Sequence, residues 1–250
     1  MIDSASTTAA VHGAFEFAAV ATGAELYRRA RRRNGMTRMN ERGAFALMVG
    51  LLIGAALGNK LVFLIERPDL WLTFWHDGAP LRLGQSLVGG LLGGLIGIEV
   101  AKALTRQPAS TGDLMVMPLA AGIALGRVGC FLAGLHDDTY GLPTTLPWGV
   151  DMGDGIARHP SALCEIAFVG ALAALLHAQR ERLAAVPGLQ FKLFLAAYLD
   201  WRLFGDLLKP VRVPYALGLS GIQWTCLIAL LFYLPLLARA GSQLPRPRPA

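Results

Sequence analysis

The chain contains a succession of apolar runs of about 20 residues, the length that a helix needs to cross the hydrocarbon core of a bilayer. The clear runs lie at 43–65, 84–104, 114–135, 161–178, 189–208 and 218–238, and a weaker one lies at 11–27. Hydrophobic residues make up 54% of the sequence and charged residues only 16%. The pattern therefore predicts an all-α polytopic membrane protein with about seven transmembrane helices.

The distribution of Lys and Arg between these runs predicts the orientation. Of the 23 basic residues, 15 fall on the side that includes the arginine cluster at 28–42, five fall on the opposite side, and three lie within runs. Basic loops mark the cytoplasmic face of a membrane protein, so the N-terminus is expected outside and the C-terminus inside. The net charge of +6 follows this topology, and we expect no nucleic-acid partner.

We expect one transmembrane domain over residues 1–250. Its core spans 43–238, preceded by the weak first run with its basic loop at 1–42 and followed by a Pro/Arg tail at 239–250. A long outer loop, 136–160, separates spans four and five, and ordered loops of this length tend to be functional. The three cysteines are predicted to be buried structural thiols.

Charged side chains inside the predicted spans are the strongest functional signal. Arg127 interrupts the fourth run, where a charge costs about 2.5–3.5 kcal/mol on insertion scales, and Gly126 and Gly129 flank it. Arg202 lies in the sixth run on one helix face with Tyr198 and Asp206. In the predicted topology both arginines, with Arg158 and Lys209, lie toward the outer leaflet.

Two interpretations of these cations remain open. Arg127 could pair with a carboxylate such as Glu99, and Arg202 with Asp206, in a purely structural role. Alternatively, the cations exceed the carboxylates on their own helices, and the surplus binds an anion. An anionic phospholipid is the natural candidate in a bacterial membrane.

Other polar and small residues have structural and functional interpretations of their own. Glycines spaced four apart in the third run favour close helix packing. Lys60 either snorkels to the membrane surface or reaches a lipid head group. The aromatic residues at 71–75 predict an interfacial belt. His12 and Glu16 lie one helical turn apart, but two residues do not make a metal site, so no metal or other cofactor is expected.

The sequence resembles the prolipoprotein diacylglyceryl transferase family over residues 43–238. The resemblance lies in the segment Gly126-Arg127-Val128-Gly129-Cys130-Phe131 through Gly141, in Leu146-Pro147-Trp148-Gly149, and in Arg158-His159-Pro160-Ser161 with Glu165. It extends to Ser86, Gly89-Gly90-Leu91, Asp113, Tyr198-Leu199-Asp200-Trp201-Arg202, Asp206, Lys209 and 220–223.

The resemblance implies a multi-pass enzyme of the bacterial inner membrane. Such an enzyme takes the diacylglyceryl group from phosphatidylglycerol and places it on the lipobox cysteine of a prolipoprotein signal peptide, releasing glycerol phosphate. It implies Arg127 and Arg202 as catalytic residues that hold the lipid phosphate, and we expect His159 to be a third catalytic residue. It also implies a substrate-binding set: Gly89, Gly90, Gly126, Gly129, Gly141, Arg158, Tyr198, Asp206 and Lys209.

The sequence departs from the family pattern at two important positions. Val88 stands where the family has a histidine, and Cys130 stands where it has an asparagine; Ala133 and Leu135 also differ. The base that deprotonates the acceptor thiol is then His159, His136, His12 or solvent. The alternatives to this enzyme are a related lipid-group transferase with another acceptor and a non-catalytic protein that binds anionic lipid.

Overall fold

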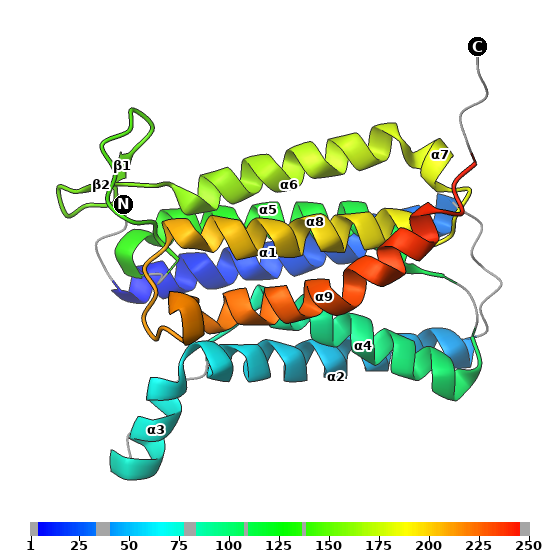
Figure 1. The fold of residues 1–250 in the computed structure, drawn as a ribbon, viewed down its shortest axis with the longest axis horizontal. Coiled ribbons are helices and arrows are strands. Elements are labelled where there is room, and N and C mark those ends of the chain that lie inside the picture. The colour runs from blue at the N-terminus through cyan, green and yellow to red at the C-terminus, as the bar shows by residue number, and fades with distance from the viewer. Residues whose placement is uncertain (1–4, 34–40, 78–83, 108–109, 137–138, 246–250) are drawn as a thin grey trace. The chain divides into compact units, whose positions relative to one another are not determined.

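The computed structural model describes residues 5–33, 41–77, 84–107, 110–136 and 139–245. Within these ranges the chain is mostly helical, with one small two-stranded sheet (Figure 1). The helical segments long and apolar enough to cross a membrane are Arg42–Glu66, Leu87–Thr105, Gly112–His136, Ser161–Ala178 and Gly221–Gly241. These five segments confirm the prediction of an all-α membrane protein, whereas seven spans with the N-terminus outside stay a prediction.

Two helices that the sequence predicted as spans are not among these five. Helix α1 (Ala5–Arg33) has 29 residues, but its composition is more polar than that of the other long helices. Helix α8 (Leu189–Gly205) has 17 residues and continues as a 3-10 turn, η3 (Asp206–Leu208). At 1.5 Å per residue α8 is about 26 Å long, slightly less than the thickness of a typical hydrocarbon core.

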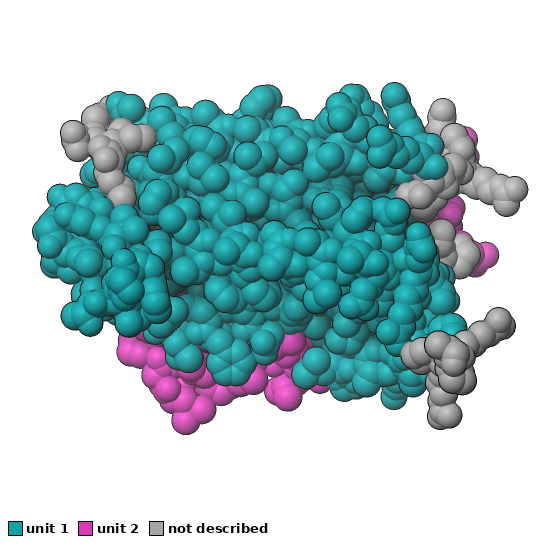
Figure 2. All heavy atoms as spheres, turned by 90° about the horizontal axis from the view of Figure 1, so that it is seen from above, with its two compact units in different colours: residues 1–34, 110–210, 232–250 teal, residues 35–109, 211–231 magenta. Residues whose placement is uncertain are grey.

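The chain divides into two compact units (Figure 2). Unit 1 comprises residues 1–34, 110–210 and 232–250, and unit 2 comprises 35–109 and 211–231. Besides α1, α8 and η3, unit 1 contains η1 (Gly112–Met115), α5 (Val116–Ala133), η2 (Gly134–His136), β1 (Val150–Asp151), β2 (Ala157–Arg158), α6 (Ser161–Ala178) and α7 (Arg180–Leu183). The prediction of one domain over 1–250 stays a prediction.

Within unit 1, α5 packs against α1 and α6, and α6 packs against α8 (Figure 1). Val116, Val169, Phe194 and Leu195 are fully buried in this unit. The Trp201 ring on α8 stacks on the Phe168 ring of α6, with ring centroids 4.5 Å apart. The apolar core therefore holds α5, α6 and α8 together.

The start of α8 is fixed by a carboxylate from another part of unit 1. Asp113 in η1 accepts the backbone N–H of Gly188 on Oδ2 at 2.6 Å and that of Phe191 on Oδ1 at 3.0 Å. The first N–H groups of a helix lack partners within the helix, and a negative charge there also interacts favourably with the helix dipole. Asp113 therefore caps α8 from 75 residues away in the sequence.

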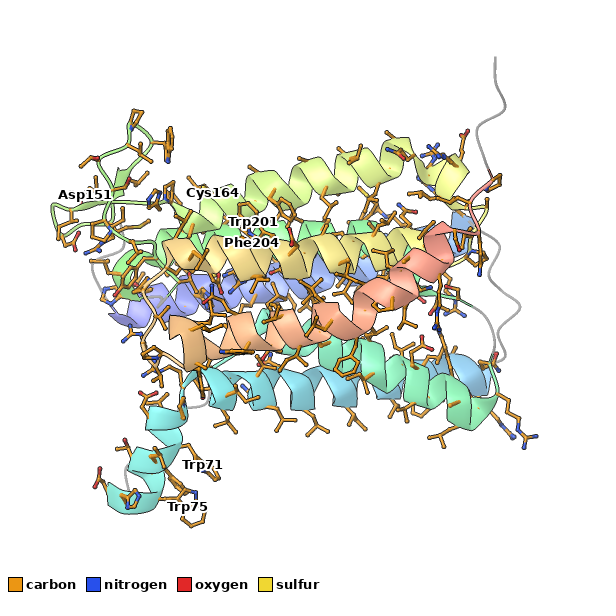
Figure 3. The ribbon with its side chains drawn as sticks, viewed as in Figure 1. Trp71, Trp75, Asp151, Cys164, Trp201 and Phe204 are labelled. Carbon is orange, nitrogen blue, oxygen red and sulfur yellow. The ribbon has the colours of Figure 1, made fainter. Side chains whose placement is uncertain are left out.

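The predicted long loop between spans four and five contains a short hairpin. Strands β1 and β2 pair antiparallel, with Val150 opposite Arg158. Asp151 lies in the hairpin at one end of unit 1 (Figure 3), and its Oδ1 accepts the backbone N–H groups of residues 153, 154 and 155 at 2.8–3.1 Å. Gly153 and Gly155 adopt positive φ angles of 107° and 77°, which glycine accommodates readily. The described part of this loop is thus locally structured.

Unit 2 contains α2 (Glu41–Glu66), α3 (Pro68–Asp77), α4 (Leu87–Thr105) and η4 (Ala216–Gly218). Helix α9 (Gly221–Gly241) begins in unit 2 and continues into unit 1 from residue 232. Glu66 accepts the backbone N–H of Ile222 at 2.8 Å, which joins the end of α2 to the start of α9 within unit 2.

Helices α2 and α4 pack along facing glycines, as the glycine spacing predicted. A Cβ added at Gly89 would overlap the Gly58 carbonyl oxygen, and one added at Gly93 would overlap that of Gly54. The other pair of glycines behaves differently. A Cβ at Gly94 would meet a Leu51 methyl group, but one at Gly90 would have ordinary contacts at 3.9 Å. The close-packing prediction is confirmed most clearly for Gly89 and Gly93.

The predicted outer segment after α2 contains helix α3 rather than an irregular loop. On α3, Trp71, Phe74 and Trp75 form an aromatic cluster, with the two tryptophan rings 5.6 Å apart (Figure 3). Lys60 donates from Nζ to the Gly84 carbonyl oxygen at 2.9 Å, so its ammonium group is hydrogen-bonded within unit 2. The aromatic belt at a membrane surface stays a prediction.

Candidate functional site

A buried carboxylate, Glu165, lies at the centre of the candidate site in unit 1. Glu165 is on the first turns of α6 and only 1% exposed. Its Oε1 accepts the Tyr198 hydroxyl at 2.6 Å, and its Oε2 lies 3.3 Å from Nη1 of Arg202. The same Oε2 lies 3.0 Å from Nε of Arg127. One carboxylate therefore joins two arginines that belong to different helices, α5 and α8.

The guanidinium of Arg127 has N–H donors that lack a strong hydrogen-bond acceptor within the described residues. Its Nε is at ion-pair distance from Glu165 but lacks the alignment of a hydrogen bond, and its Nη1 donates to the Cys130 sulfur at 3.6 Å. Within the described residues, that sulfur is its only hydrogen-bond acceptor. A thiol sulfur is a weak acceptor, so an oxyanion would be a better partner for this guanidinium.

The structural hypothesis for Arg127 named the wrong partner. Glu99 pairs with Lys102 on its own helix at 2.7 Å, and its side chain is 57% exposed rather than part of the core. Arg127 pairs with Glu165 instead. Sequence reasoning named Glu165 only as part of the family resemblance and gave it no role, because spacing along the chain does not show which helix lies beside Arg127. The available signal was an acidic residue near the start of an apolar run, where it is costly.

Arg202 lies between two carboxylates. Its Nη2 donates to Oδ2 of Asp206 at 2.8 Å, and Lys209 reaches Oδ1 of Asp206 at 3.0 Å. Arg202, Asp206 and Lys209 therefore form one group of contacting side chains, as their spacing along the helix predicted. Three cations and two carboxylates meet in this cluster, formed by Arg127, Glu165, Arg202, Asp206 and Lys209, and leave one net positive charge.

Arg158 belongs to a different set of contacts. It donates to Oδ2 of Asp154 at 2.6 Å and lies over the Tyr140 ring, 5.3 Å from its centroid. The hydrogen bond from Arg158 lowers the pKa of the Asp154 carboxyl. The structure therefore gives Arg158 partners in the hairpin, whereas no contact joins it to Glu165 among the described residues.

Gly141 and His159 are neighbours next to this hairpin. A Cβ added at Gly141 would overlap the His159 carbonyl oxygen and lie 2.7 Å from the His159 Cβ. The His159 backbone N–H donates to Leu142 at 3.0 Å. Gly141 therefore serves the packing of this loop, and the catalytic role of His159 stays a prediction.

The two glycines beside Arg127 have different surroundings. A Cβ added at Gly129 would lie 2.7 Å from the Phe15 Cβ, so Gly129 allows α1 to approach α5 closely. A Cβ added at Gly126 would have no neighbour within 4 Å in the described structure, so the backbone there faces open space. Gly129 has a packing role, and Gly126 leaves room next to the arginine.

Cys130 is not the buried structural thiol that the sequence analysis predicted. Its side chain is partly exposed, and its sulfur lies 3.6 Å from Nε2 of His12 on α1 as well as 3.6 Å from Arg127. Cys164, at the start of α6 (Figure 3), is also partly exposed, whereas Cys226 is buried as expected. The error arose because apolar flanking residues indicate a membrane span but not which face of the helix packs inward.

Comparison with known proteins identifies the family. The family model of prolipoprotein diacylglyceryl transferase matches residues 4–239. The chain belongs to the prolipoprotein diacylglyceryl transferase family. It is 31% identical over 205 residues to phosphatidylglycerol–prolipoprotein diacylglyceryl transferase of Geobacter sulfurreducens, a match that covers 78% of this chain and 74% of the relative.

Two further relatives carry the same name. The protein of Idiomarina loihiensis is 30% identical over 211 residues, which cover 79% of this chain and 74% of the relative. That of Wolbachia pipientis from Culex pipiens is 33% identical over 135 residues, about half of each chain at 51% and 48%. The family is one of transferases, which confirms the resemblance stated from the sequence motifs.

Val88 is one of the departures from the family pattern that the sequence analysis named. Val88 is buried at the start of α4 in unit 2, beside Gly89 and Gly90, and has no titratable group. The roles of the two glycines in substrate binding stay predictions. Among the described residues, no cluster of three or more His, Cys, Asp or Glu side chains could hold a metal ion.

Proposed function

We propose that this protein transfers the diacylglyceryl group of phosphatidylglycerol to the lipobox cysteine of a prolipoprotein, with release of glycerol phosphate. The observation that carries the proposal is the pair of buried arginines, Arg127 and Arg202, on either side of Glu165. Membership of the transferase family and the names of its relatives support the identity of the lipid and of the acceptor.

The charge of the arginine cluster suits a lipid phosphodiester. Glu165 neutralises part of the charge of both arginines and thereby allows two guanidinium groups to lie close together in a buried place. The remaining net positive charge matches the single negative charge of the lipid. Guanidinium groups bind phosphate oxygens through directed hydrogen bonds, and Arg127 has only the weak thiol acceptor to give up.

The same groups can assist the chemical step. A thiolate sulfur attacks the glyceryl carbon that carries the phosphate ester, the C–O bond breaks, and its electron pair leaves with the phosphate. Negative charge therefore grows on the phosphate oxygens, where Arg127 and Arg202 stabilise it. Removal of one such preorganised donor costs about 10²–10³ in kcat in other enzymes.

The remaining residues of the cluster position the arginines. Asp206 accepts from Arg202 and from Lys209, which fixes the guanidinium of Arg202 along α8. Tyr198 donates to Glu165, so the carboxylate cannot rotate without losing a buried hydrogen bond. Binding roles for Arg158, Gly126 and Gly141 complete the proposed site.

The proposal includes the membrane topology. Seven spans with the N-terminus outside and the C-terminus inside would require α1 and α8 to cross the bilayer in addition to the five apolar helices. The basic residues Arg31, Arg32 and Arg33 at the end of α1 favour a cytoplasmic position for that end. We accordingly assign the protein to a bacterial inner membrane, with the arginine cluster toward the outer leaflet.

The decisive experiment uses the purified full-length protein in vesicles of phosphatidylglycerol. A lipobox peptide is added, and mass spectrometry looks for a diacylglyceryl thioether on its cysteine. The matched controls are vesicles of phosphatidylcholine and a peptide with serine at the acceptor position, neither of which should give product. Absence of product under conditions in which a relative such as the Geobacter protein gives one would refute the proposal.

The same assay separates the alternative functions. A lipid-group transferase with another acceptor would release glycerol phosphate in the presence of a membrane extract but would leave the lipobox peptide unmodified. A protein that only binds anionic lipid would retain phosphatidylglycerol on purification and release nothing. Arg127→Lys is the informative variant, because it keeps the charge but loses the planar, forked donors.

A further inference from the structure

His12 lies in an arrangement that is typical of a base acting on a thiol. Its Nε2 is 3.6 Å from the Cys130 sulfur, and its Nδ1 is 3.8 Å from Oε1 of Glu16, one helical turn further along α1. The His12 side chain is 31% exposed and that of Glu16 is 41% exposed, so a substrate could reach the imidazole. A base next to a thiol, oriented by a third group, is the arrangement found in many thiol-activating sites.

The family signature itself brings the histidine to this position. Gly129 precedes Cys130, and a Cβ added at Gly129 would lie 2.7 Å from the Phe15 Cβ and 3.7 Å from the His12 Cα. Only a residue without a side chain allows α1 to approach α5 so closely at this level. The contact between the helices therefore places His12 directly beside the segment that carries Arg127.

Cys130 links the histidine to the proposed phosphate site. Its sulfur lies 3.6 Å from Nε2 of His12 and also 3.6 Å from Nη1 of Arg127. A sulfur atom in this region can therefore contact the arginine of the phosphate site and an imidazole at the same time. An acceptor thiol that attacks the lipid must approach the same arginine, because that arginine holds the leaving phosphate.

The other histidines have no comparable surroundings. The chain has five histidines in all. Within the described structure, no carboxylate or thiol lies at hydrogen-bond distance from the rings of His76, His136 or His159, and the ring of His177 pairs with Arg180. His12 is thus distinguished from the rest by having a carboxylate on one side and a thiol on the other.

We propose that His12 is the general base of the transfer, with Glu16 as its positioning residue. This inference depends on the proposed function. Nε2 of His12 takes the proton from the acceptor thiol, and the resulting thiolate forms the new S–C bond at the glyceryl carbon. The C–O bond to phosphate breaks, glycerol phosphate leaves with the electron pair, and the imidazolium returns its proton to the released phosphate or to water.

Glu16 determines which nitrogen accepts the proton. A carboxylate near Nδ1 favours the tautomer with hydrogen on Nδ1, which leaves the Nε2 lone pair free to accept. The same carboxylate stabilises the imidazolium after proton transfer. This chain can in this way dispense with a titratable group at position 88, where valine stands.

The first part of the test measures thiol chemistry without any transfer assay. In a variant with Cys164→Ser and Cys226→Ser, Cys130 is the only thiol, and its rate of alkylation by iodoacetamide is measured at pH 7 in vesicles. If His12 accepts a thiol proton here, His12→Ala should slow alkylation about tenfold, and added imidazole should restore part of the rate. Equal rates with and without His12 would overturn the proposal.

The second part measures transfer to the lipobox peptide. His12→Ala should lower kcat by about 10²–10⁴ with a much smaller change in KM, and imidazole should recover part of the loss. Glu16→Gln should have a smaller effect, and His177→Gln is the matched control that should behave as wild type. Full activity of His12→Ala, or a loss that imidazole does not rescue, would refute the role of base.

The two parts separate this inference from the proposed function. If the wild-type protein gives no product with any acceptor, the proposed function fails and the alkylation rates alone decide. A slower reaction of Cys130 in His12→Ala, rescued by imidazole, would then still support an acid–base pair at this place. Circular dichroism of each variant confirms that the helices remain folded.

Discussion

Tyr198 donates its hydroxyl hydrogen to Oε1 of Glu165 over 2.6 Å, and this buried bond joins α8 to α6. The other oxygen of the same carboxylate lies near both Arg127 and Arg202. A single side chain thus fixes the distance between two cations that would otherwise repel each other. The consequences of this arrangement can be tested one residue at a time.

Glu165→Gln should destabilise the protein strongly. The change leaves Arg127 and Arg202 buried without the carboxylate between them, and breaking a buried ion pair from one side costs about 3–5 kcal/mol. The free energy of unfolding in detergent, measured by denaturant titration, checks this. Glu181→Gln on the exposed face of α7 is the matched control and should change stability little. A stable Glu165→Gln variant would show that the carboxylate is not needed to hold the arginines.

Tyr198→Phe should give a milder loss. It removes one buried hydrogen bond to a charged acceptor and keeps the ring, so we expect a cost of about 1–3 kcal/mol. Turnover should fall because Glu165 and both arginines lose their fixed orientation. Tyr215→Phe, at an exposed tyrosine whose hydroxyl donates to the Ile65 carbonyl oxygen, is the comparison. Equal effects of the two changes would contradict the positioning role of Tyr198.

Gly129→Val should separate α1 from α5. The added side chain would meet Phe15 at 2.7 Å, and such overpacking typically costs about 1–3 kcal/mol. Thermal unfolding of the purified protein measures the loss, and Cys130 labelling reports whether the contact with His12 persists. Gly170→Ala on α6 is the control, since no atom lies within 4 Å of its added Cβ. Unchanged stability of Gly129→Val would refute the close approach of the two helices.

Two neighbouring glycines in unit 2 should respond differently to alanine. Gly93→Ala would overlap the Gly54 backbone and should destabilise the packing of α2 on α4, again by about 1–3 kcal/mol. Gly90→Ala has room for its methyl group and should leave thermal stability nearly unchanged. A loss of transfer activity in this variant would therefore indicate that Gly90 contacts the substrate. Similar melting temperatures for the two variants would contradict the glycine packing described here.

The hairpin provides a prediction about pH. The hydrogen bond from Arg158 lowers the pKa of Asp154 below its ordinary 3.8, so the ion pair stabilises the hairpin above that pH. The stabilisation is lost as pH falls through the lowered pKa of the folded state. Carbon-13 NMR of labelled aspartate can follow the titration. In Arg158→Gln the Asp154 pKa should rise toward its ordinary value; an unchanged titration would rule out the ion pair in solution.

The sequence predicted the helices well because each one is determined by an apolar run in its own segment of the chain. The predicted span 161–178 coincides with α6, and the other clear runs agree with the structure to within a few residues. The weak run at 11–27 is an exception, because α1 extends well beyond it at both ends. The tertiary partners of buried charges were harder to predict, because they depend on which helices are neighbours. Spacing along α8 correctly grouped Arg202 with Asp206, whereas Arg127 found its partner on α6.

The environment of Cys130 was missed for a related reason. Helical periodicity places His12 and Glu16 on one face of their helix, but it does not say that this face meets α5. Gly129 was the available signal, because a helix position without a side chain allows another helix to approach closely. The residue that packs against Gly129 is Phe15, and the sequence alone did not indicate this partner. Small residues in a membrane sequence indicate that something packs there, but not what it is.

The cap that Asp113 places on α8 has a consequence for the depth of the arginine cluster. Phe191, which the Asp113 carboxylate binds, is 11 residues before Arg202, about 16 Å along a helix. Because a helix is rigid, a cap that fixes the start of α8 also fixes the position of Arg202 near its end. Asp113→Ala would let α8 slide or turn about its axis, and the guanidinium of Arg202 would then miss the level of Glu165. A carboxylate at the start of α8 would in this way control the position of a guanidinium near the end of that helix.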